Sequence, residues 1–368
     1  MAVQVKRAKL AGDGALERAS ALLGRARLAV IGGLLTDIAG AEAALALAEK
    51  LGGVIDHAAG EGLCRASRIM RETGGCPASM GEVRNRADIV VLVGDGPLKR
   101  EPGLLTALFP KKEGLPRPGN NSRGLVLLGC GEAEVPAHIP VTRIGLGNLD
   151  LATLVARLSA AVHQHQAQVL DDDLATTLQG LAERLRAGAF PVFVISYCDL
   201  DDQVLRTVLD MVRHLCVTTR AANLSVPAPG NGDGVNLCSV WTCGLPVRTS
   251  FASGLPEHDA RMYGARRLIE SGEADALLWV EALPTFGVER PQGVPTVVLS
   301  STGNGATAAD DVAIEVGCPG VDHDAELYLW SIAGIGMVKA TRPNGGAPTV
   351  AEVLGRIAER LGSPEARA

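Results

Sequence analysis

A short run of branched apolar residues, Ile89 to Val93, places the strongest constraint on the fold of this chain. Residues 74–88 precede it as a loop rich in glycine and small residues and then a short polar run, and Gly94-Asp95-Gly96-Pro97 closes it. Five such residues between turn-forming segments predict a strand that is buried on both faces, as in a parallel sheet. Open α/β sheets bind their ligands in loops that follow such strands. The segment therefore predicts an α/β fold and directs attention to the loop after Val93.

Further segments repeat this alternation of strand and helix. Residues 28–33, 40–51 and 53–56 predict one βαβ unit, whose two strands should be parallel. Pro227 to Asn236 is the clearest loop or linker signal. The alternation predicts an α/β fold with two doubly wound, mainly parallel sheets. We expect further strands at 125–128, 141–144, 191–196, 274–281, 296–300 and 312–316, helices at 63–72, 148–166, 171–187, 201–215, 259–271 and 349–361, and a hairpin at 327–340.

The composition limits the class of protein. With 368 residues the chain is long enough for two lobes, and its net charge of −6 argues against nucleic acid as a partner. No apolar run reaches the roughly 18 residues of a membrane span. Met1 to Leu10 carry basic residues, but no apolar signal-peptide core follows them. We therefore expect a cytoplasmic protein without a membrane partner.

The cysteines do not follow a metal-binding pattern. None of the eight forms a Cys-x2-Cys pair, which structural zinc sites and iron–sulfur clusters favour. In sequence, Cys238 and Cys243 come closest to one another. We interpret the cysteines as mostly reduced, buried apolar residues.

Several glycine-rich loops follow predicted strands, and such loops can bind phosphate through backbone N–H groups. Ser301 to Gly305 is the best phosphate candidate, followed by the loops at Gly94–Gly96, Gly145–Gly147 and Gly230–Gly234. None of them matches a Rossmann fingerprint or a P-loop. As turns alone these loops need no ligand, so both interpretations stay open.

Other reactive side chains lack a local catalytic motif. His163 and His165 are two positions apart, which disfavours a shared metal on one helix face. Cys64 lies near a predicted helix start, where the helix dipole lowers a thiol pKa, but a buried packing role is the competing interpretation. No G-x-S-x-G motif is present.

The segment Gly81 to Pro97, GEVRNRADIVVLVGDGP, resembles the B subunit of formylmethanofuran dehydrogenase, a relative of the molybdopterin oxidoreductases. Similar passages follow at residues 232–246 and 273–280. The resemblance implies a molybdopterin-oxidoreductase-like fold with interleaved lobes. Residues 1–58 and 226–368 would form one lobe, with the first βαβ unit joining the C-terminal strands, and residues 59–225 the other.

The departures from the redox family concern its cofactors. Residues 1–63 contain no cysteine for the [4Fe–4S] cluster, so we expect the N-terminal iron–sulfur domain to be lacking. Cys64 falls near the position of the molybdenum or tungsten ligand, but Arg65-Ala66-Ser67 replaces the His-Gly-Pro that follows it in the family. We expect no catalytic, cofactor-binding or metal-ligating residue on this chain.

This pattern is similar to the B subunit of the formyltransferase/hydrolase complex of aerobic methylotrophic bacteria. The resemblance implies a non-catalytic structural subunit in tetrahydromethanopterin- and methanofuran-linked one-carbon metabolism, where formaldehyde is oxidised to formate. Its partners would be the amidohydrolase-like zinc-containing A subunit, the C subunit and the formyltransferase D subunit, which would carry the zinc and a methanofuran-like carrier. The alternatives are a catalytic molybdenum- or tungsten-pterin formylmethanofuran dehydrogenase subunit and an unrelated nucleotide-binding α/β protein.

Overall fold

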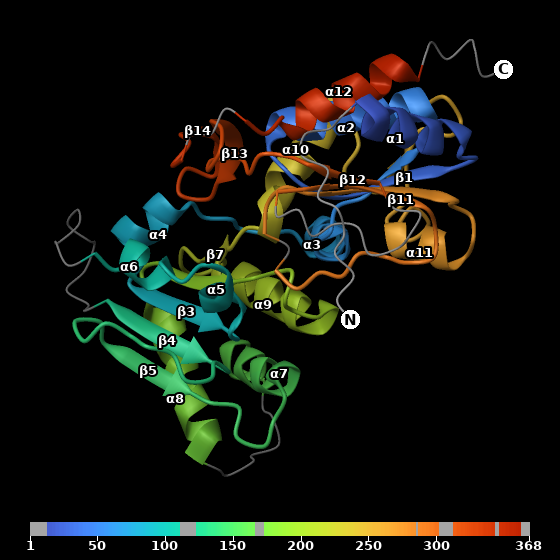
Figure 1. Cartoon of the computed structure of the whole chain (residues 1–368). Coiled ribbons are helices and arrows are strands. Elements are labelled where there is room, and N and C mark those ends of the chain that lie inside the picture. Colours follow the sequence, from blue (N-terminus) through green and yellow to red (C-terminus); the bar gives the residue numbers. More distant parts are fainter. Residues whose placement is uncertain are drawn as a thin grey trace, which may run out of the picture. The chain divides into compact units, whose positions relative to one another are not determined.

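The computed structural model describes residues 13–110, 123–165, 173–284, 286–301, 312–342 and 346–361. Contacts divide the chain into two units, each with its own sheet (Figure 1). The terminal unit comprises Met1–Cys64, Ala228–Leu329 and Gly334–Ala368. The middle unit comprises Arg65–Pro227 and Trp330–Ala333.

The sheet of the terminal unit has the strand order β12-β11-β10-β1-β2-β8-β9. Its pairings are parallel except for those of β8 with β2 and β9. The pairing of β1 with β10 confirms that the first strand joins the C-terminal strands. The strands are β1 (Ala29–Leu35), β2 (Val54–Ile55), β8 (Thr249–Ser250), β9 (Glu257–His258), β10 (Ala276–Glu281), β11 (Thr296–Ser300) and β12 (Val312–Glu315).

Helices cover both faces of this sheet (Figure 1). One layer contains α1 (Asp13–Arg25), α2 (Ile38–Leu51) and α12 (Val350–Arg360). On the other face, α11 (Ala265–Glu270) packs its Leu268 and Ile269 on Val30, Leu277 and Trp279. The 3-10 turn η1 (Pro229–Asn231) and helix α10 (Gly232–Cys243) follow in sequence, and α10 packs against α2. The expected hairpin is β13 (Ala325–Leu329) with β14 (Gly334–Val338).

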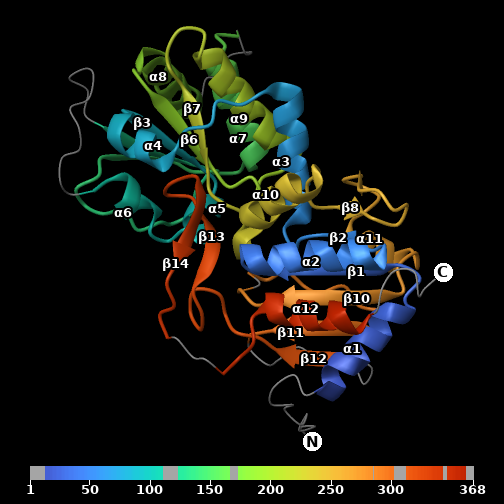
Figure 2. The ribbon, with the colours of Figure 1, turned by 90° about the horizontal axis from the view of Figure 1, so that it is seen from above.

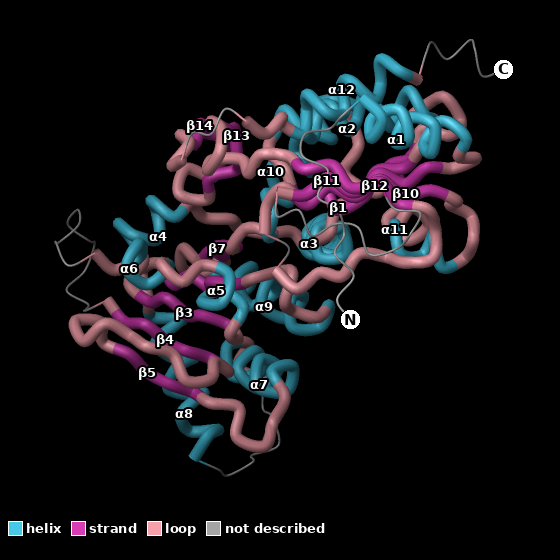
Figure 3. The backbone as a smooth tube through the Cα atoms, in the orientation of Figure 1, coloured by secondary structure: helices cyan, strands magenta, loops and turns pink. Residues whose placement is uncertain are grey.

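The sheet of the middle unit is entirely parallel, in the order β5-β4-β3-β6-β7. Figure 3 shows β3, β4 and β5 side by side. It consists of β3 (Ile89–Val93), β4 (Gly124–Leu128), β5 (Val141–Ile144), β6 (Pro191–Ile195) and β7 (Ala222–Ser225). All five residues of β3 are buried, as its apolar run predicts. The two sheets confirm an α/β fold that is mainly parallel in both units.

The helices of the middle unit form two groups. Helices α7 (Leu151–Val162), α8 (Asp173–Ala187) and α9 (Asp202–Leu215) pack on one another, and α9 also packs along β6 and β7 (Figure 2). Helices α4 (Met80–Arg86) and α6 (Leu104–Leu108) bury Val83, Leu104 and Leu108 in a core with alternate residues of the central strands. Helix α5 (Gly96–Arg100) follows β3, and α3 (Gly60–Thr73) contains the boundary between the units.

Two helices lie where the sequence predicts irregular chain. The polar run at 81–88 is α4, which begins with a capping box between Ser79 and Glu82. The predicted loop 227–236 is a helix from Gly232 onward. A Cβ atom on Gly232 would lie 2.7 Å from the Ala228 Cβ and 3.0 Å from the His57 ring, so this glycine permits close packing. Conversely, the predicted helix 259–271 shortens to α11.

Within the described ranges, no helix is both long enough and apolar enough to traverse a bilayer.

Candidate functional site

The carboxyl end of the middle sheet is the place where this topology would bind a ligand. The chain leaves β3 toward β4 and returns to place β6 on the other side of β3, so the strand order reverses between β3 and β6. The loops that meet there contain Gly94 to Pro97 after β3 and Ser196 to Asp199 after β6. A Cβ atom on Gly96 would lie 2.8 Å from the Asp199 carboxylate, so only glycine fits.

The carboxylate of Asp199 is already bound within the protein. Arg100 donates to its Oδ2 and Oδ1 atoms at 3.0 and 2.7 Å, and the Ser196 hydroxyl also donates to it. Burial opposes ionisation, but the hydrogen bonds from Arg100 and Ser196 hold the pKa of Asp199 below its ordinary value. A bidentate ion pair between Arg100 and Asp199 therefore occupies the place where the strand order reverses. Because Asp199 is bound in this pair, it is not placed as a general base.

Asp95, in the loop after β3, is likewise engaged. Its Oδ1 accepts the Gly131 N–H at 2.7 Å, and Lys99 Nζ lies 3.2 Å from Oδ2. The Gly131 hydrogen bond lowers the pKa of Asp95. Cys130 donates from Sγ to the Gly94 carbonyl at 3.2 Å, and burial raises its pKa to about 12. These loops thus bind one another through their own polar groups.

A cavity of about 550 Å³ opens beside these loops. Its polar lining includes three carboxylates, Asp95, Glu132 and Glu134, against the single cation Lys99, and its apolar lining includes Leu98 and Leu105. The Gly131 N–H, which could bind an anion, donates to Asp95 instead. This lining disfavours a phosphate or pterin-dinucleotide ligand because its charges would repel the anion.

The polar residues just before β3 have structural roles. Asp88 accepts backbone N–H groups from Ile89, Ala189 and Phe190 at 3.0, 2.6 and 2.9 Å, so it fixes the start of β3 against the start of β6. Glu82 caps α4 and pairs with Arg220 at 2.7 Å. These two residues of the Gly81–Pro97 segment therefore stabilise the start of the sheet and of α4.

Buried Arg123 completes this arrangement. Its guanidinium donates to the carbonyl oxygens of Val83, Arg84 and Leu108, at the ends of α4 and α6, and stacks on the Phe109 ring with its Cζ 4.0 Å from the ring centroid. Carbonyl groups at helix C-termini carry partial negative charge, which a cation stabilises.

In the terminal unit, Asp56 and Arg248 form a buried pair after β2. Asp56 accepts N–H groups from His57 and Ala265 at 2.9 and 2.8 Å, and Arg248 Nε lies 3.4 Å from its Oδ1. Burial raises the pKa of Asp56 despite these contacts. Their side chains are only 7% and 12% exposed, so the pair is largely shielded from solvent.

His57 lies beside this pair and is neutral. The Ala59 N–H donates to its Nδ1 at 2.9 Å, which leaves the proton on Nε2, 3.3 Å from the Gly230 carbonyl. Burial lowers its pKa to about 4. His57 thus connects β2 to the turn before α10.

Asp37 and His323 form a second acidic–basic pair in this unit. Asp37 caps α2 through the Gly40 N–H at 3.0 Å, and its Oδ2 lies 3.5 Å from His323 Nε2. Within the described part of the chain, both ring nitrogens of His323 are buried without a hydrogen-bond partner. The main contact of Asp37 is therefore the hydrogen bond that caps α2, since it is shorter than the contact with His323.

Cys64 is buried in α3, 8% exposed, with its Sγ 4.0 Å from the Val247 carbonyl. Burial raises its pKa to about 11, so the thiol stays protonated. The helix-start position in the sequence therefore does not produce a thiolate here, because desolvation outweighs the dipole.

The remaining candidates do not assemble a centre. His163 and His165 stack on each other, and His163 also contacts His214 and Asp210, its Nε2 lying 3.2 Å from Asp210 Oδ2. In the ranges that the structure covers, no group of three or more His, Cys, Asp or Glu could hold a metal ion. Of the phosphate candidate, Thr302 to Gly305 lie outside the described residues.

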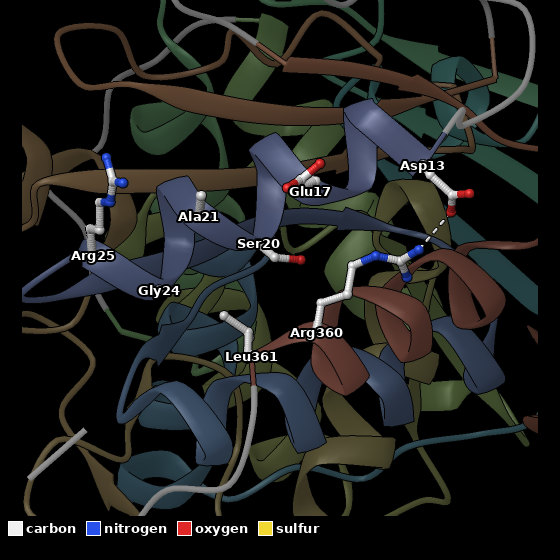
Figure 4. A pocket seen from close by; sticks show the side chains of 8 residues that line it. All are labelled: Asp13, Glu17, Ser20, Ala21, Gly24, Arg25, Arg360 and Leu361. Atoms are coloured by element: carbon white, nitrogen blue, oxygen red, sulfur yellow. Dashed lines mark hydrogen bonds and ion pairs between the residues drawn. The ribbon is translucent and has the colours of Figure 1, made fainter. Parts of the chain in front are cut away.

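A second cavity, of about 540 Å³, lies between α1 and α12 (Figure 4). Figure 4 shows Arg360 reaching to Asp13, with an N···O distance of 2.7 Å, while Ser20 faces the space between the helices. The Ser20 hydroxyl donates to Leu16 O at 2.8 Å. The lining of this cavity contains neither cysteine nor histidine, and its one serine already donates within α1.

No family model matches the chain. It is 28% identical to the B subunit of the formyltransferase/hydrolase complex Fhc from Methylorubrum extorquens, over 98% of both chains. The crystal structure of that complex with methylofuran contains a chain that matches with a TM-score of 0.83 and 27% identity, over 96% of this chain and 98% of the other. The chain is a homologue of the Fhc B subunit.

A more distant relationship links this homologue of the Fhc B subunit to a redox enzyme. It is 22% identical to the B subunit of a tungsten-containing formylmethanofuran dehydrogenase from Methanocaldococcus jannaschii, over 92% of this chain and 81% of the other. The residues present do not fit that enzyme's kind of metal centre. The first 63 residues lack cysteine, and Arg65-Ala66-Ser67, without a histidine, follow Cys64.

Proposed function

We propose that this chain is the non-catalytic structural B subunit of a formyltransferase/hydrolase complex in methanofuran- and tetrahydromethanopterin-linked one-carbon metabolism. The match to the Fhc B subunit over 98% of both chains carries the proposal. Its partners are the amidohydrolase-like zinc-containing A subunit, the C subunit and the formyltransferase D subunit, and the zinc and carrier belong to those partners. This chain binds no molybdenum, tungsten, pterin or iron–sulfur cluster.

The arrangement of polar residues supports a structural role. Asp95 and Asp199 at the ends of β3 and β6 are bound by residues of the neighbouring loops and of α5. Asp88 and Arg123 fix the elements around β3. A catalytic acid or base has to lie within hydrogen-bond reach of the substrate group to which it transfers a proton. The carboxylates of Asp95 and Asp199 instead make their hydrogen bonds to groups of the protein.

Co-expression with candidate A, C and D subunits tests the proposal. We expect a stable complex that contains this chain, produces formate from formyl-tetrahydromethanopterin and holds zinc. The matched pair Asp199→Asn and Asp210→Asn, one at the sheet end and one on α9 beside His163, should give the same turnover per assembled complex. A loss of a hundredfold or more with Asp199→Asn alone, at normal assembly, would assign a catalytic site to this chain.

The second candidate is a molybdenum- or tungsten-pterin formylmethanofuran dehydrogenase subunit, which the relationship to the Methanocaldococcus enzyme favours. Elemental analysis of the natively purified complex separates the two. Stoichiometric molybdenum or tungsten with an extractable pterin would establish the redox function and reject the structural one.

A further inference from the structure

Two cysteines of the middle unit face each other although they are far apart in sequence. The Sγ atoms of Cys76 and Cys216 are 3.6 Å apart, and the two residues are 140 positions apart in the chain. Cys76 lies in the loop between α3 and α4, and Cys216 is the C-cap residue of α9. The sequence spacing gives no sign of this pair.

Backbone hydrogen bonds fix both residues at one edge of the middle sheet. The Asn223 N–H donates to Cys76 O at 2.9 Å, and the Ala78 N–H donates to Asn223 O at 2.8 Å, so residues 76–78 extend the sheet beyond β7. Helix α9 packs along the same strand, and Cys216 Sγ lies 3.1 Å from Ala221 O. The two sulfurs are thus presented to each other by three segments that are already joined.

We propose that Cys76 and Cys216 form a reversible intramolecular disulfide when the protein meets a peroxide. A disulfide has an S–S distance of about 2.05 Å, so the sulfurs must approach by about 1.5 Å, a movement that rotation of two short side chains can supply. The bond would close a long loop and hold residues 76–78 on β7, which would cover that sheet edge covalently.

The chemistry needs only the peroxide as a two-electron oxidant. Cys216 is exposed, so its thiolate attacks a peroxide oxygen, breaks the O–O bond and becomes a sulfenic acid while hydroxide leaves. The Cys76 thiolate then attacks the Cys216 sulfur, the S–O bond breaks and a second hydroxide leaves. With the two thiol protons, the products are one disulfide and two waters.

The different environments of the two sulfurs fit this order. Cys76 is partly buried, and burial together with the neighbouring Cys216 raises its pKa. It is therefore the slower thiol toward an oxidant in solution but is held next to the sulfur that it must attack.

Peptide mapping of the full chain tests the proposal. After treatment with hydrogen peroxide and blocking with N-ethylmaleimide, trypsin should release peptides 72–84 and 214–220, each with a single cysteine, as one disulfide-linked species. Its mass should be about 2 Da below the sum of the free peptides, and dithiothreitol should separate them. The oxidised protein should melt about 5 °C higher than the reduced one.

Cys76→Ser and Cys216→Ser should each abolish the linked species and the shift in Tm. Cys243→Ser is the matched control, since the Cys243 sulfur contacts oxygen atoms of Ser239 and Leu245, and it should leave both unchanged. The same peptide mapping on the assembled complex shows whether the disulfide also forms when the chain is bound to its partners. Oxidation of Cys216 to sulfinic acid without the link, or disulfide-linked dimers in its place, would overturn the proposal.

Discussion

At the carboxyl end of the middle sheet, Asp199 keeps its charge because Arg100 and Ser196 bind it. In the terminal unit, the groups after β2 are buried far more deeply. Burial raises the pKa of Asp56 despite its contact with Arg248, and it lowers the pKa of His57 to about 4. One sheet end is stabilised by a partly exposed ion pair, and the other by groups for which desolvation dominates.

The difference shows that an Asp–Arg pair can have opposite effects on the aspartate pKa at two sheet ends of one chain. The pKa of Asp199 is lowered, whereas that of Asp56 is raised. Exposed charges gain little from pairing, whereas a buried charge that loses its partner is costly. Asp199 and Asp95 at one sheet end, and Asp56 at the other, are each bound by groups of the protein itself. The contrast can be tested by removing one partner from each pair.

The largest expected effect is that of Arg248→Met. This substitution leaves Asp56 buried with only two backbone N–H donors, so we expect the terminal unit to lose about 3 kcal/mol of stability. Arg100→Met is the matched change in the middle unit. Because the Asp199 side chain is 33% exposed, water can solvate the carboxylate, and we expect a loss of only about 1 kcal/mol. Calorimetric unfolding of both variants measures the difference, and equal losses would contradict the contrast.

The pH dependence of stability should also separate the two regions. The folded pKa of His57 is about 4, below its ordinary value of 6.5, so between these values the unfolded state binds more protons. Stability should therefore fall as the pH falls from about 6.5 to about 4, by about 3 kcal/mol from this group. Asp199 and Asp95 have lowered pKa values, so their contributions are present above about 3.8 and are lost only under more acidic conditions.

The substitution His57→Gln removes the titrating imidazole. Comparison with the unaltered protein therefore gives the contribution of His57 to the pH dependence of stability. Because the pKa of Asp56 is raised, this residue makes stability fall as the pH rises just above 3.8, opposite in sign to His57. Asp56 is present in both the unaltered protein and the variant, so its contribution largely cancels when the two are compared. Melting temperatures measured from pH 4.5 to 7.5 at constant ionic strength should show a shallower slope for the variant. Parallel curves would mean that His57 is not held neutral by the fold.

The fold could be predicted where short-range patterns carry the information. The strand Ile89–Val93 is recognisable from its five apolar residues, and β11 has the predicted bounds. Helix α4 escapes prediction because Gly81 and its charged neighbours resemble a loop, although the Ser79–Glu82 spacing is a visible capping signal. Helix α10 escapes it because Gly232 indicates flexibility, whereas the glycine serves close packing against His57.

The candidate site is harder to predict because its partners are distant in sequence. Asp199 and Arg100 are 99 positions apart, and Cys76 and Cys216 are 140 apart. No local motif records such pairings, which depend on the order of strands in the sheet. The sequence also does not predict that Cys64 is protonated. A position near a helix start lowers a thiol pKa and deep burial raises it, and the sequence does not show which effect is larger.

The smallest expected effect is that of Cys130→Ser, which replaces a partly buried sulfur of the middle unit by a hydroxyl. Cys64→Ser is the same change at a buried sulfur of the terminal unit. In Cys64→Ser, the hydroxyl would have the Val247 carbonyl as its nearby acceptor, 4.0 Å from the present sulfur, so we expect a loss of roughly 1–3 kcal/mol. In Cys130→Ser, the Gly94 carbonyl lies 3.2 Å from the sulfur, close enough for a hydroxyl to donate, so we expect a loss below about 0.5 kcal/mol.

Stability and turnover together decide what Cys64 does. Urea unfolding measures the first quantity, and formate production per assembled complex, on the proposed function, measures the second. A packing residue should lower stability while leaving turnover within about twofold, because no transition-state contact is lost. A nucleophile or metal ligand would lose activity by orders of magnitude at normal assembly. That second outcome for Cys64→Ser, with Cys130→Ser unaffected, would place chemistry at the terminal unit after all.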